Sequence, residues 1–229
     1  MESSAFSEQI TEERRMFVPR QYREPDTSWM ADLIRTNPLA LLVSNGSPET
    51  GPLATHLPVI VDPAADAVPA ADLAGTTLLA HMNRANPHWS AITTDSTILL
   101  TFTGPHAYVS PAVYEMTPAA PTWDFTSVHV HGTVEKIESI EETLKVVQST
   151  VRAYESEFGH GWDMTESLGY FRKIVPAVGA FRVLVSGAEG MFKLSQEQES
   201  HVRDRVHKSF ASSGCTRHRA TAELMSRLP

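Results

Sequence analysis

Apolar and polar residues alternate along much of the chain with a period of two. Other runs are solidly apolar, and Gly, Pro, Asn or Asp bounds most of them. Both patterns are typical of β-strands, the first half-buried and the second fully buried. They predict strands at residues 39–45, 53–62, 76–82, 96–104, 106–111, 126–138 and 178–186.

The segment before the first strand predicts a short helix. Asp26 or Thr27 can cap its first backbone amides, and Pro38 ends it. Its shared apolar face consists of Trp29, Leu33 and Ile34.

A longer segment with helical periodicity separates the last two predicted strands. Ser139 and Glu142 form a capping-box pattern at its start, and Gly159 stops it. Its apolar stripe consists of Leu144, Val147, Val151, Tyr154 and Phe158. A second, shorter helix over 163–174 should turn Met164, Leu168 and Phe171 inward. The charged tail after residue 194 also favours a helix.

These strands and clustered helices predict an α+β domain built on a small antiparallel barrel. We place it at residues 16–193, after a flexible N-terminal extension (1–15) and before a C-terminal helical tail (194–229). Small barrels fill their interior with side chains. A ligand would therefore bind at the barrel edge or between subunits, which makes a homodimer the expected state.

The composition supports a core and disfavours several functions. The 229 residues are 41% hydrophobic, and the formal net charge is −8, with no block of Lys and Arg. Such a chain repels phosphate backbones, so direct DNA binding is not expected. No apolar run approaches the ~20 residues of a membrane span, and the polar N-terminus is no secretory signal. With Cys215 as the single cysteine, we expect a cytoplasmic protein.

One histidine interrupts an apolar strand, in the stretch ATHLP. From the pattern alone, His56 is interpreted as a core imidazole bonded to a carbonyl. The alternative is an axial ligand of haem iron, because neutral imidazole ligates haem well. His129 and His131 share a strand face and could clamp a metal, but a polar surface or a dimer contact is the commoner reason for such a pair.

Two cations occur in settings that suit a cofactor or catalysis. Arg84, in HMNRANPHW, could neutralise a propionate or phosphate group, or it could be a solvated surface arginine. Lys193 is flanked by Phe192 and Leu194, and desolvation by apolar neighbours can make a lysine an acid–base group. The commoner alternative is a lysine whose ammonium reaches water. No Walker, GxGxxG or GxSxG motif is present, which disfavours nucleotide chemistry and serine hydrolysis.

Several ordered motifs resemble the PaiB-like family, over roughly residues 16 to 200. They are MFVPRQYREPD, THLPVIVDP, HMNRANPHW, FTGPHAYVSP, PTWDFTSVHVHG and FKLSQ. Proteins of this family are usually labelled FMN-binding negative transcriptional regulators. The resemblance implies an α+β split β-barrel, similar to pyridoxamine phosphate oxidase, with peripheral helices.

Within that family the chain is more similar to the piperazate synthases. The motifs TPAAPTWDFTSVHVHG and EGMFKLSQEQ carry this likeness, whereas regulators more often have PTWNY and KLSQN. The likeness implies a haem b enzyme that cyclises N5-hydroxy-L-ornithine to L-piperazic acid, forming an N–N bond with loss of water. The alternative is a PaiB-like transcriptional regulator that binds FMN or haem, or a flavin oxidoreductase.

The same resemblance implies roles for individual residues. His56 would be the axial ligand of the haem iron, with His81, His88 and His106 as rivals. Lys193 would be the acid–base group. The remaining cofactor-binding residues, in a pocket at the dimer interface, would be Arg84, His106, Tyr108, Trp123 and Phe125.

Overall fold

The computed structural model describes residues 16–26, 28–64 and 73–228. Its contacts divide the chain into two compact units. We call residues 26–104 and 130–188 the barrel unit, and residues 1–25, 105–129 and 189–229 the tail unit. The N-terminal extension predicted at 1–15 lies outside the described residues, and the predicted domain boundaries stay a prediction.

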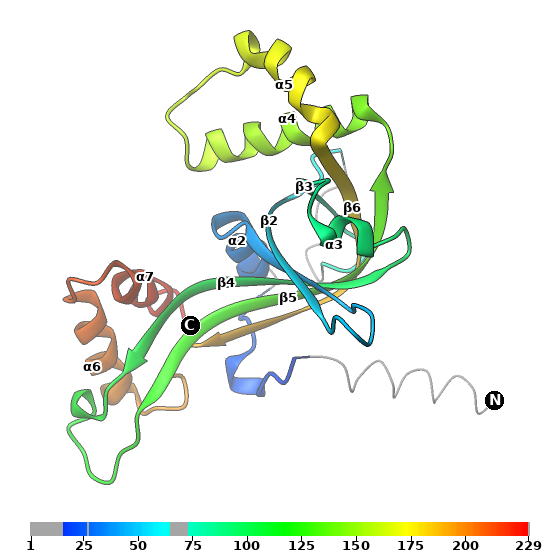
Figure 1. The fold of residues 1–229 in the computed structure, drawn as a ribbon. Helices are drawn as coiled ribbons and strands as arrows, with labels where there is room; N and C mark the ends of the chain where they lie inside the picture. The colour runs from blue at the N-terminus through cyan, green and yellow to red at the C-terminus, as the bar shows by residue number, and fades with distance from the viewer. Residues whose placement is uncertain (1–15, 27, 65–72, 229) are drawn as a thin grey trace. The chain divides into compact units, whose positions relative to one another are not determined.

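Six strands form a closed barrel in the order β1-β2-β3-β6-β5-β4 (Figure 1). They are β1 (Leu39–Ser44), β2 (Leu53–Val61), β3 (Thr77–Asn83), β4 (Thr97–Val109), β5 (Thr122–Ile137) and β6 (Val178–Lys193). The pairs β1–β2, β1–β4, β2–β3 and β3–β6 are antiparallel. The predicted α+β class with an antiparallel barrel is confirmed.

Strands β4, β5 and β6 are longer than predicted. The two strands predicted at 96–104 and 106–111 are one strand, β4, which continues through Gly104 and Pro105. The sequence predicts a break there because Gly and Pro bound the two runs. In the structure the Pro105 carbonyl oxygen still accepts a hydrogen bond, from Thr126 Oγ1 at 3.1 Å. Strands β5 and β6 each span 16 residues.

Apolar side chains fill the interior of the barrel. The largest of them are at most 2% exposed: Leu42, Leu57, Leu78, Leu100, Phe102 and Phe181. Burying one such side chain stabilises the fold by about 1.5–3 kcal/mol. Because this interior is packed, a cofactor site in the barrel unit must lie on its outside.

In its described residues the barrel unit also contains four α-helices, of which the longest carries an N-terminal cap. They are α2 (Ser28–Thr36), α3 (Pro87–Ala91), α4 (Ile140–Glu157) and α5 (Leu168–Ile174), with 3-10 turns at Thr165–Ser167 and Val175–Ala177. Ser139 Oγ accepts the Glu142 amide of α4 at 3.3 Å, as predicted. The α2 prediction is also confirmed, with Trp29, Leu33 and Ile34 buried.

The buried faces of α4 and α5 differ from the prediction. Helix α4 buries Thr143, Leu144, Val146 and Thr150, whereas Val147 and Val151 are half-buried and Phe158 is exposed. Its inner face packs on an apolar cluster of the barrel's outer wall, which includes Ile60 and Leu79. No residue of α5 is buried. Phe171 of α5 instead pairs on the surface with Trp162, at 6.4 Å between ring centroids.

The described residues of the tail unit include two packed helices and two 3-10 turns. The helices are α6 (Ser200–Ala211) and α7 (Thr216–Met225), and the turns are η1 (Arg20–Tyr22) and η2 (Pro111–Val113). Helix α6 buries Val202, Val206 and Phe210, and the Phe210 ring lies 5.1 Å from that of His218 in α7. Helix α6 confirms the helix predicted for the charged segment after residue 194, and the tail as a separate part of the chain stays a prediction. Among the helices that the structure describes, none has the length and apolar character needed to cross a bilayer.

Candidate functional site

A histidine lies on the outer wall of the barrel unit in a row of cross-strand neighbours. His56 of β2 pairs with Leu41 of β1, and Leu41 pairs with Thr101 of β4. Side chains two positions apart on a strand share a face. The same outer face therefore also carries Leu39, Pro58 and Thr103.

The His56 imidazole is exposed, not buried. Its neighbour Leu57 is 1% exposed and points into the barrel, so strand alternation turns His56 outward. The interpretation of His56 as a core histidine bonded to a carbonyl is therefore wrong. Within the described residues its ring takes part in no hydrogen bond, so both nitrogens are accessible to a ligand.

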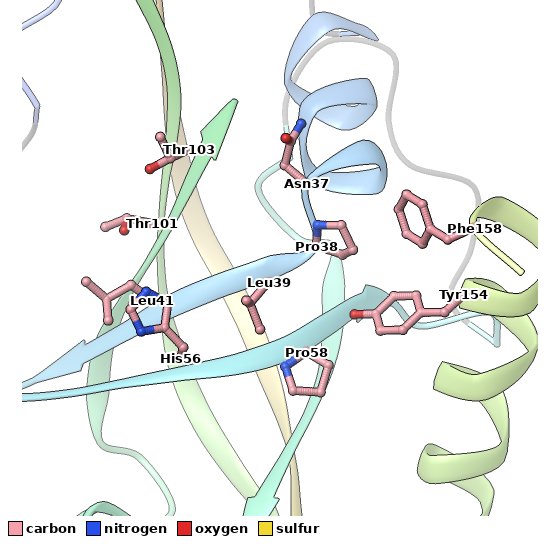
Figure 2. Close-up of a pocket in the computed structure, with 10 residues that line it drawn as sticks. All are labelled: Asn37, Pro38, Leu39, Leu41, His56, Pro58, Thr101, Thr103, Tyr154 and Phe158. Atoms are coloured by element: carbon pink, nitrogen blue, oxygen red, sulfur yellow. The ribbon is translucent and has the colours of Figure 1, made fainter. Parts of the chain in front are cut away.

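A pocket of 510 Å³ surrounds this histidine (Figure 2). Strands β1, β2 and β4 supply one side, and Tyr154 and Phe158 at the end of α4 supply another. The Tyr154 hydroxyl donates to the Val59 carbonyl oxygen at 3.1 Å, and burial raises the pKa of this phenol to about 12. None of the ten lining residues is Lys or Arg. The pocket thus offers apolar walls, threonine hydroxyls and one accessible imidazole.

Two rival histidines lie elsewhere in the barrel unit. His88 is 2% exposed, and both of its ring nitrogens are engaged: Nε2 lies 2.8 Å from Ser44 Oγ, and Nδ1 lies 2.9 Å from Thr55 Oγ1. Burial lowers the pKa of His88 and also that of the half-buried His81. His88 could bind a metal only by giving up one of these hydrogen bonds.

Arg84 makes structural contacts near the start of β6. Its Nε donates to the Val178 carbonyl oxygen at 2.9 Å, and its guanidinium lies 5.2 Å from the centre of the Trp89 ring. Lys136 approaches the same ring at 4.1 Å. Arg84 does not line the His56 pocket. Its predicted contact with an acidic group of a cofactor stays a prediction.

The tail unit brings three predicted pocket residues together. The Trp123 ring lies 5.9 Å from that of His106 and 5.8 Å from that of Tyr108. Trp123 Nε1 donates to His106 Nδ1 at 3.3 Å. Trp123 and Tyr108 are 48% and 45% exposed, and Phe125 is half-buried. An exposed aromatic surface of this kind suits a flat ligand, and its role as cofactor lining stays a prediction.

Lys193 ends β6 and is held by β5. Its ammonium donates to Thr122 Oγ1 and, at 3.0 Å, to the Trp123 carbonyl oxygen, and it lies 5.9 Å from the Tyr22 ring. Phe192 is 1% exposed, but adjacent residues of a strand point to opposite faces. The sequence led us to expect that Phe192 desolvates the ammonium, but Phe192 points to the opposite face of the strand. Thr122 and Tyr22 lie next to the ammonium instead, and the sequence predicted neither contact.

A buried carboxyl lies in the same unit. Asp124 is 0% exposed, and its Oδ2 accepts a hydrogen bond from Ser195 Oγ at 2.7 Å. Desolvation raises the pKa of Asp124 to about 6, against the opposing effects of the Ser195 bond and the Lys193 ammonium. Burial also raises the pKa values of Tyr22 and Tyr114. Sequence reasoning noted the aspartate of PTWDF but did not predict its burial.

The KLSQ motif forms the turn that follows β6. Ser195 has a φ of 63° and is 0% exposed. The Gln196 side chain accepts the Leu194 amide at 2.6 Å and donates to the Phe192 carbonyl oxygen. This turn places the Ser195 hydroxyl against Asp124 directly after Lys193. Among all the residues that the structure describes, no group of three His, Cys, Asp or Glu side chains is arranged to hold a metal ion.

The chain matches a known protein family over most of its length. The family described as "Putative FMN-binding domain" matches residues 16–187. The chain belongs to this family. "Protease synthase and sporulation protein PAI 2" of Bacillus subtilis is 25% identical over 186 residues, which cover 80% of this chain and 83% of that protein. The predicted PaiB-like family is thereby confirmed. "Uncharacterized protein AN0679" of Emericella nidulans is 24% identical over 243 residues, covering 92% and 96%.

Solved structures with the same fold are distant in sequence. The "FAD and Heme binding protein" of Mycobacterium smegmatis has a TM-score of 0.55 and 13% identity, covering 80% of this chain and 78% of that one. The "Flavocytochrome Anf3" of Azotobacter vinelandii has a TM-score of 0.55 and 15% identity, covering 83% and 79%. At these identities the likeness establishes the fold, and the predicted split-barrel class is confirmed.

Proposed function

We propose that the protein is a haem-dependent piperazate synthase. It would convert N5-hydroxy-L-ornithine to L-piperazic acid. The α-nitrogen forms a bond to N5 and the N–O bond breaks. One proton leaves the α-nitrogen and one joins the departing hydroxyl, so the products are the ring and water. The family, and the motifs that distinguish this chain from the regulators, support this reaction.

The exposed imidazole of His56 is the observation that favours haem over flavin. Haem iron accepts histidine as an axial ligand, and apolar walls suit the macrocycle. The phosphate of FMN would instead favour cationic side chains or a helix N-terminus, and the ten lining residues include neither Lys nor Arg. One of the two structural neighbours is described as a FAD and haem binding protein and the other as a flavocytochrome, and both descriptions are compatible with either cofactor.

The chain's own residues would hold the cofactor and move the protons. His56 would ligate the iron. Bound haem iron would supply a Lewis acid that polarises the N–O bond. Lys193, held by Thr122 and the Trp123 carbonyl, would give a proton to the departing hydroxyl. His106, Tyr108 and Trp123 are among the other cofactor-binding residues that the resemblance implies.

A homodimer is part of this proposal. Leu39 and Phe158 line the His56 pocket and are 64% and 50% exposed. A second copy that covered them would remove this apolar surface from water, which favours association. Light scattering of the haem-loaded protein should give twice the mass of one chain, and a monomer that retains haem would contradict the dimer.

The haem assignment is tested by absorption spectra. The purified protein loaded with haem b should have a Soret band, and His56→Ala should lose this band or shift it while the far-UV circular dichroism stays that of the wild type. His201→Ala removes an exposed histidine of α6 and serves as the control. A His56→Ala spectrum identical to that of the wild type would move the ligand to another histidine. A protein that takes up FMN and not haem would favour the flavin-binding or regulatory alternative.

The role of Lys193 is tested by turnover. Lys193→Ala should keep the haem spectrum and lose at least ~10²-fold in turnover, if no other group moves the proton. Lys193→Arg should not restore activity, because a guanidinium does not give up its proton at workable pH. Lys145→Ala, on the exposed side of α4, is the control. Turnover of Lys193→Ala within a few-fold of the wild type would leave Lys193 without a catalytic role.

A further inference from the structure

Ser195 has a backbone conformation that favours glycine, although it is fully buried. Its φ of 63° lies in the left-handed region, where residues other than glycine are uncommon. Ser195 is 0% exposed, so its hydroxyl does not serve a solvated turn. A residue in a strained conformation persists only where its surroundings compensate the strain. The serine side chain must therefore contribute something that glycine could not.

The Ser195 hydroxyl reaches the neighbouring strand. Strands β5 and β6 are neighbours in the barrel order. Ser195 Oγ donates to Asp124 Oδ2 of β5 at 2.7 Å, and Asp124 is also 0% exposed. Water does not compete for a hydrogen bond between two buried groups, which strengthens it. This bond attaches the turn after β6 to β5.

The shape of the turn is set by Gln196. Its side chain accepts the Leu194 amide at 2.6 Å and donates to the Phe192 carbonyl oxygen. Both bonds are local, because they join residues two and four positions apart. They fix the conformation of the turn but not its place on β5, so that place depends on contacts that cross between the strands.

Lys193 makes the other cross-strand contacts at this point. Its ammonium donates to Thr122 Oγ1 and to the Trp123 carbonyl oxygen, the two residues directly before Asp124. A lysine side chain is long and flexible, and a half-buried one can extend to water instead. The ammonium meets both acceptors only while the end of β6 keeps its place on β5.

We infer that Ser195 is a positioning residue for Lys193. Its buried hydrogen bond with Asp124 fixes the end of β6 on β5, and this places the ammonium at its two acceptors. Glycine would form the turn with less strain but could not attach it. The consequence for catalysis rests on the proposed function. A lysine that samples several positions would meet the departing hydroxyl less often than one held in a single place.

Competitive acetylation measures where the ammonium lies. The full cofactor-free chain is treated with trace acetic anhydride, and peptide mass spectrometry gives the rate at each lysine. In the wild type, Lys193 should react more slowly than the exposed Lys208 of α6, because its nitrogen donates two hydrogen bonds. Ser195→Gly removes the hydroxyl and relieves the backbone, and should raise the Lys193 rate relative to Lys208 by at least ~3-fold. Ser195→Ala, which removes only the oxygen, should do the same.

Two references separate this placement from a general loosening of the fold. Lys136 is also half-buried, and it donates to the Trp89 carbonyl oxygen at 2.7 Å. Its rate should stay the same in both Ser195 variants. Asp95→Gly makes a similar exchange at another residue of positive φ, 70°, whose side chain is exposed. This control should leave the Lys193 rate unchanged.

The wild type alone can overturn the inference, whether or not a variant folds. A Lys193 as reactive as Lys208 in the wild type would show that the ammonium is not held. A Lys193 rate that neither Ser195 variant changes, or that rises together with the rate of Lys136, would also overturn it. A rise in Ser195→Ala alone would assign the effect to backbone strain and not to the hydroxyl.

Turnover of the haem-loaded protein tests the catalytic consequence. Ser195→Gly should keep the Soret band and lower kcat by ~10-fold to ~10²-fold, with KM within a few-fold, because proton transfer and not substrate binding is impaired. An unchanged kcat beside a faster Lys193 acetylation would refute the link to catalysis. A wild type without turnover would contradict the proposed function, whereas acetylation needs neither haem nor substrate. The two failures are therefore seen in different experiments.

Discussion

Replacing Asp124 with Asn should change how the stability of the protein depends on pH. The Asp124 pKa is raised from 3.8 to about 6 in the folded chain, mainly because the carboxyl is desolvated. The folded state therefore binds this proton more tightly than the unfolded state does. The stability that protonation confers is present at low pH and is lost as the pH rises through about 6.

The size of this effect follows from the shift. One pKa unit corresponds to about 1.4 kcal/mol, so a shift of about two units gives about 3 kcal/mol. Asp124 is 0% exposed, so water does not screen the effect. From about pH 4 to pH 7.5 this carboxyl should lower the wild-type free energy of unfolding by about 2–3 kcal/mol. The amide of Asp124→Asn does not titrate, so the variant lacks this loss.

Urea unfolding of the cofactor-free protein at both pH values measures the difference. Comparing the two pH values cancels any effect of the substitution that does not depend on pH, and the protein concentration is held fixed. Asp204→Asn, at an exposed position of α6, is the control. If the stabilities of wild type and Asp124→Asn stay parallel across this range, the carboxyl is not desolvated in the folded state and the argument fails.

Two further predictions test the barrel unit. A Cβ at Gly179 would lie 2.6 Å from atoms of the Trp89 ring, so Gly179→Ala should cost about 1–3 kcal/mol in thermal unfolding. Gly169→Ala meets nothing within 4 Å and should change stability by less than about 1 kcal/mol, and equal melting temperatures for the two variants would contradict this packing. Burial lowers the pKa of His88, so the folded state disfavours its protonation and the wild-type stability should fall as the pH drops below 6.5. His88→Gln should lose less stability between about pH 7 and pH 5, and an equal loss would show that His88 does not carry this dependence.

The period-two pattern predicted the barrel but not which face of each strand is inward. Val59 and Ile60 are both apolar, because Val59 is buried in the barrel wall while Ile60 packs in the cluster beneath α4. Because apolar residues occupy both odd and even positions of this strand, the sequence did not determine to which face His56 points. The core interpretation therefore failed, although the strand itself was predicted correctly.

The neighbours of Lys193 could not be predicted from the sequence for a different reason. Thr122 lies before the strand start predicted at 126, and Lys193 lies beyond the strand end predicted at 186. Their contact exists because β5 and β6 are longer than predicted and are neighbours in the barrel order. Tyr22 comes from a third, distant segment, and no local pattern could place it beside the ammonium.

The formation of the N–N bond can be observed directly in the product. The haem-loaded protein is incubated with N5-hydroxy-L-ornithine labelled with ¹⁵N at both nitrogens, and the mixture is examined by NMR and mass spectrometry. Cyclisation should give a product lighter by one water in which the two ¹⁵N nuclei are coupled through one bond, and neither heat-treated protein nor free haem should form it. Unchanged substrate in the presence of protein with an intact Soret band would contradict the proposed reaction.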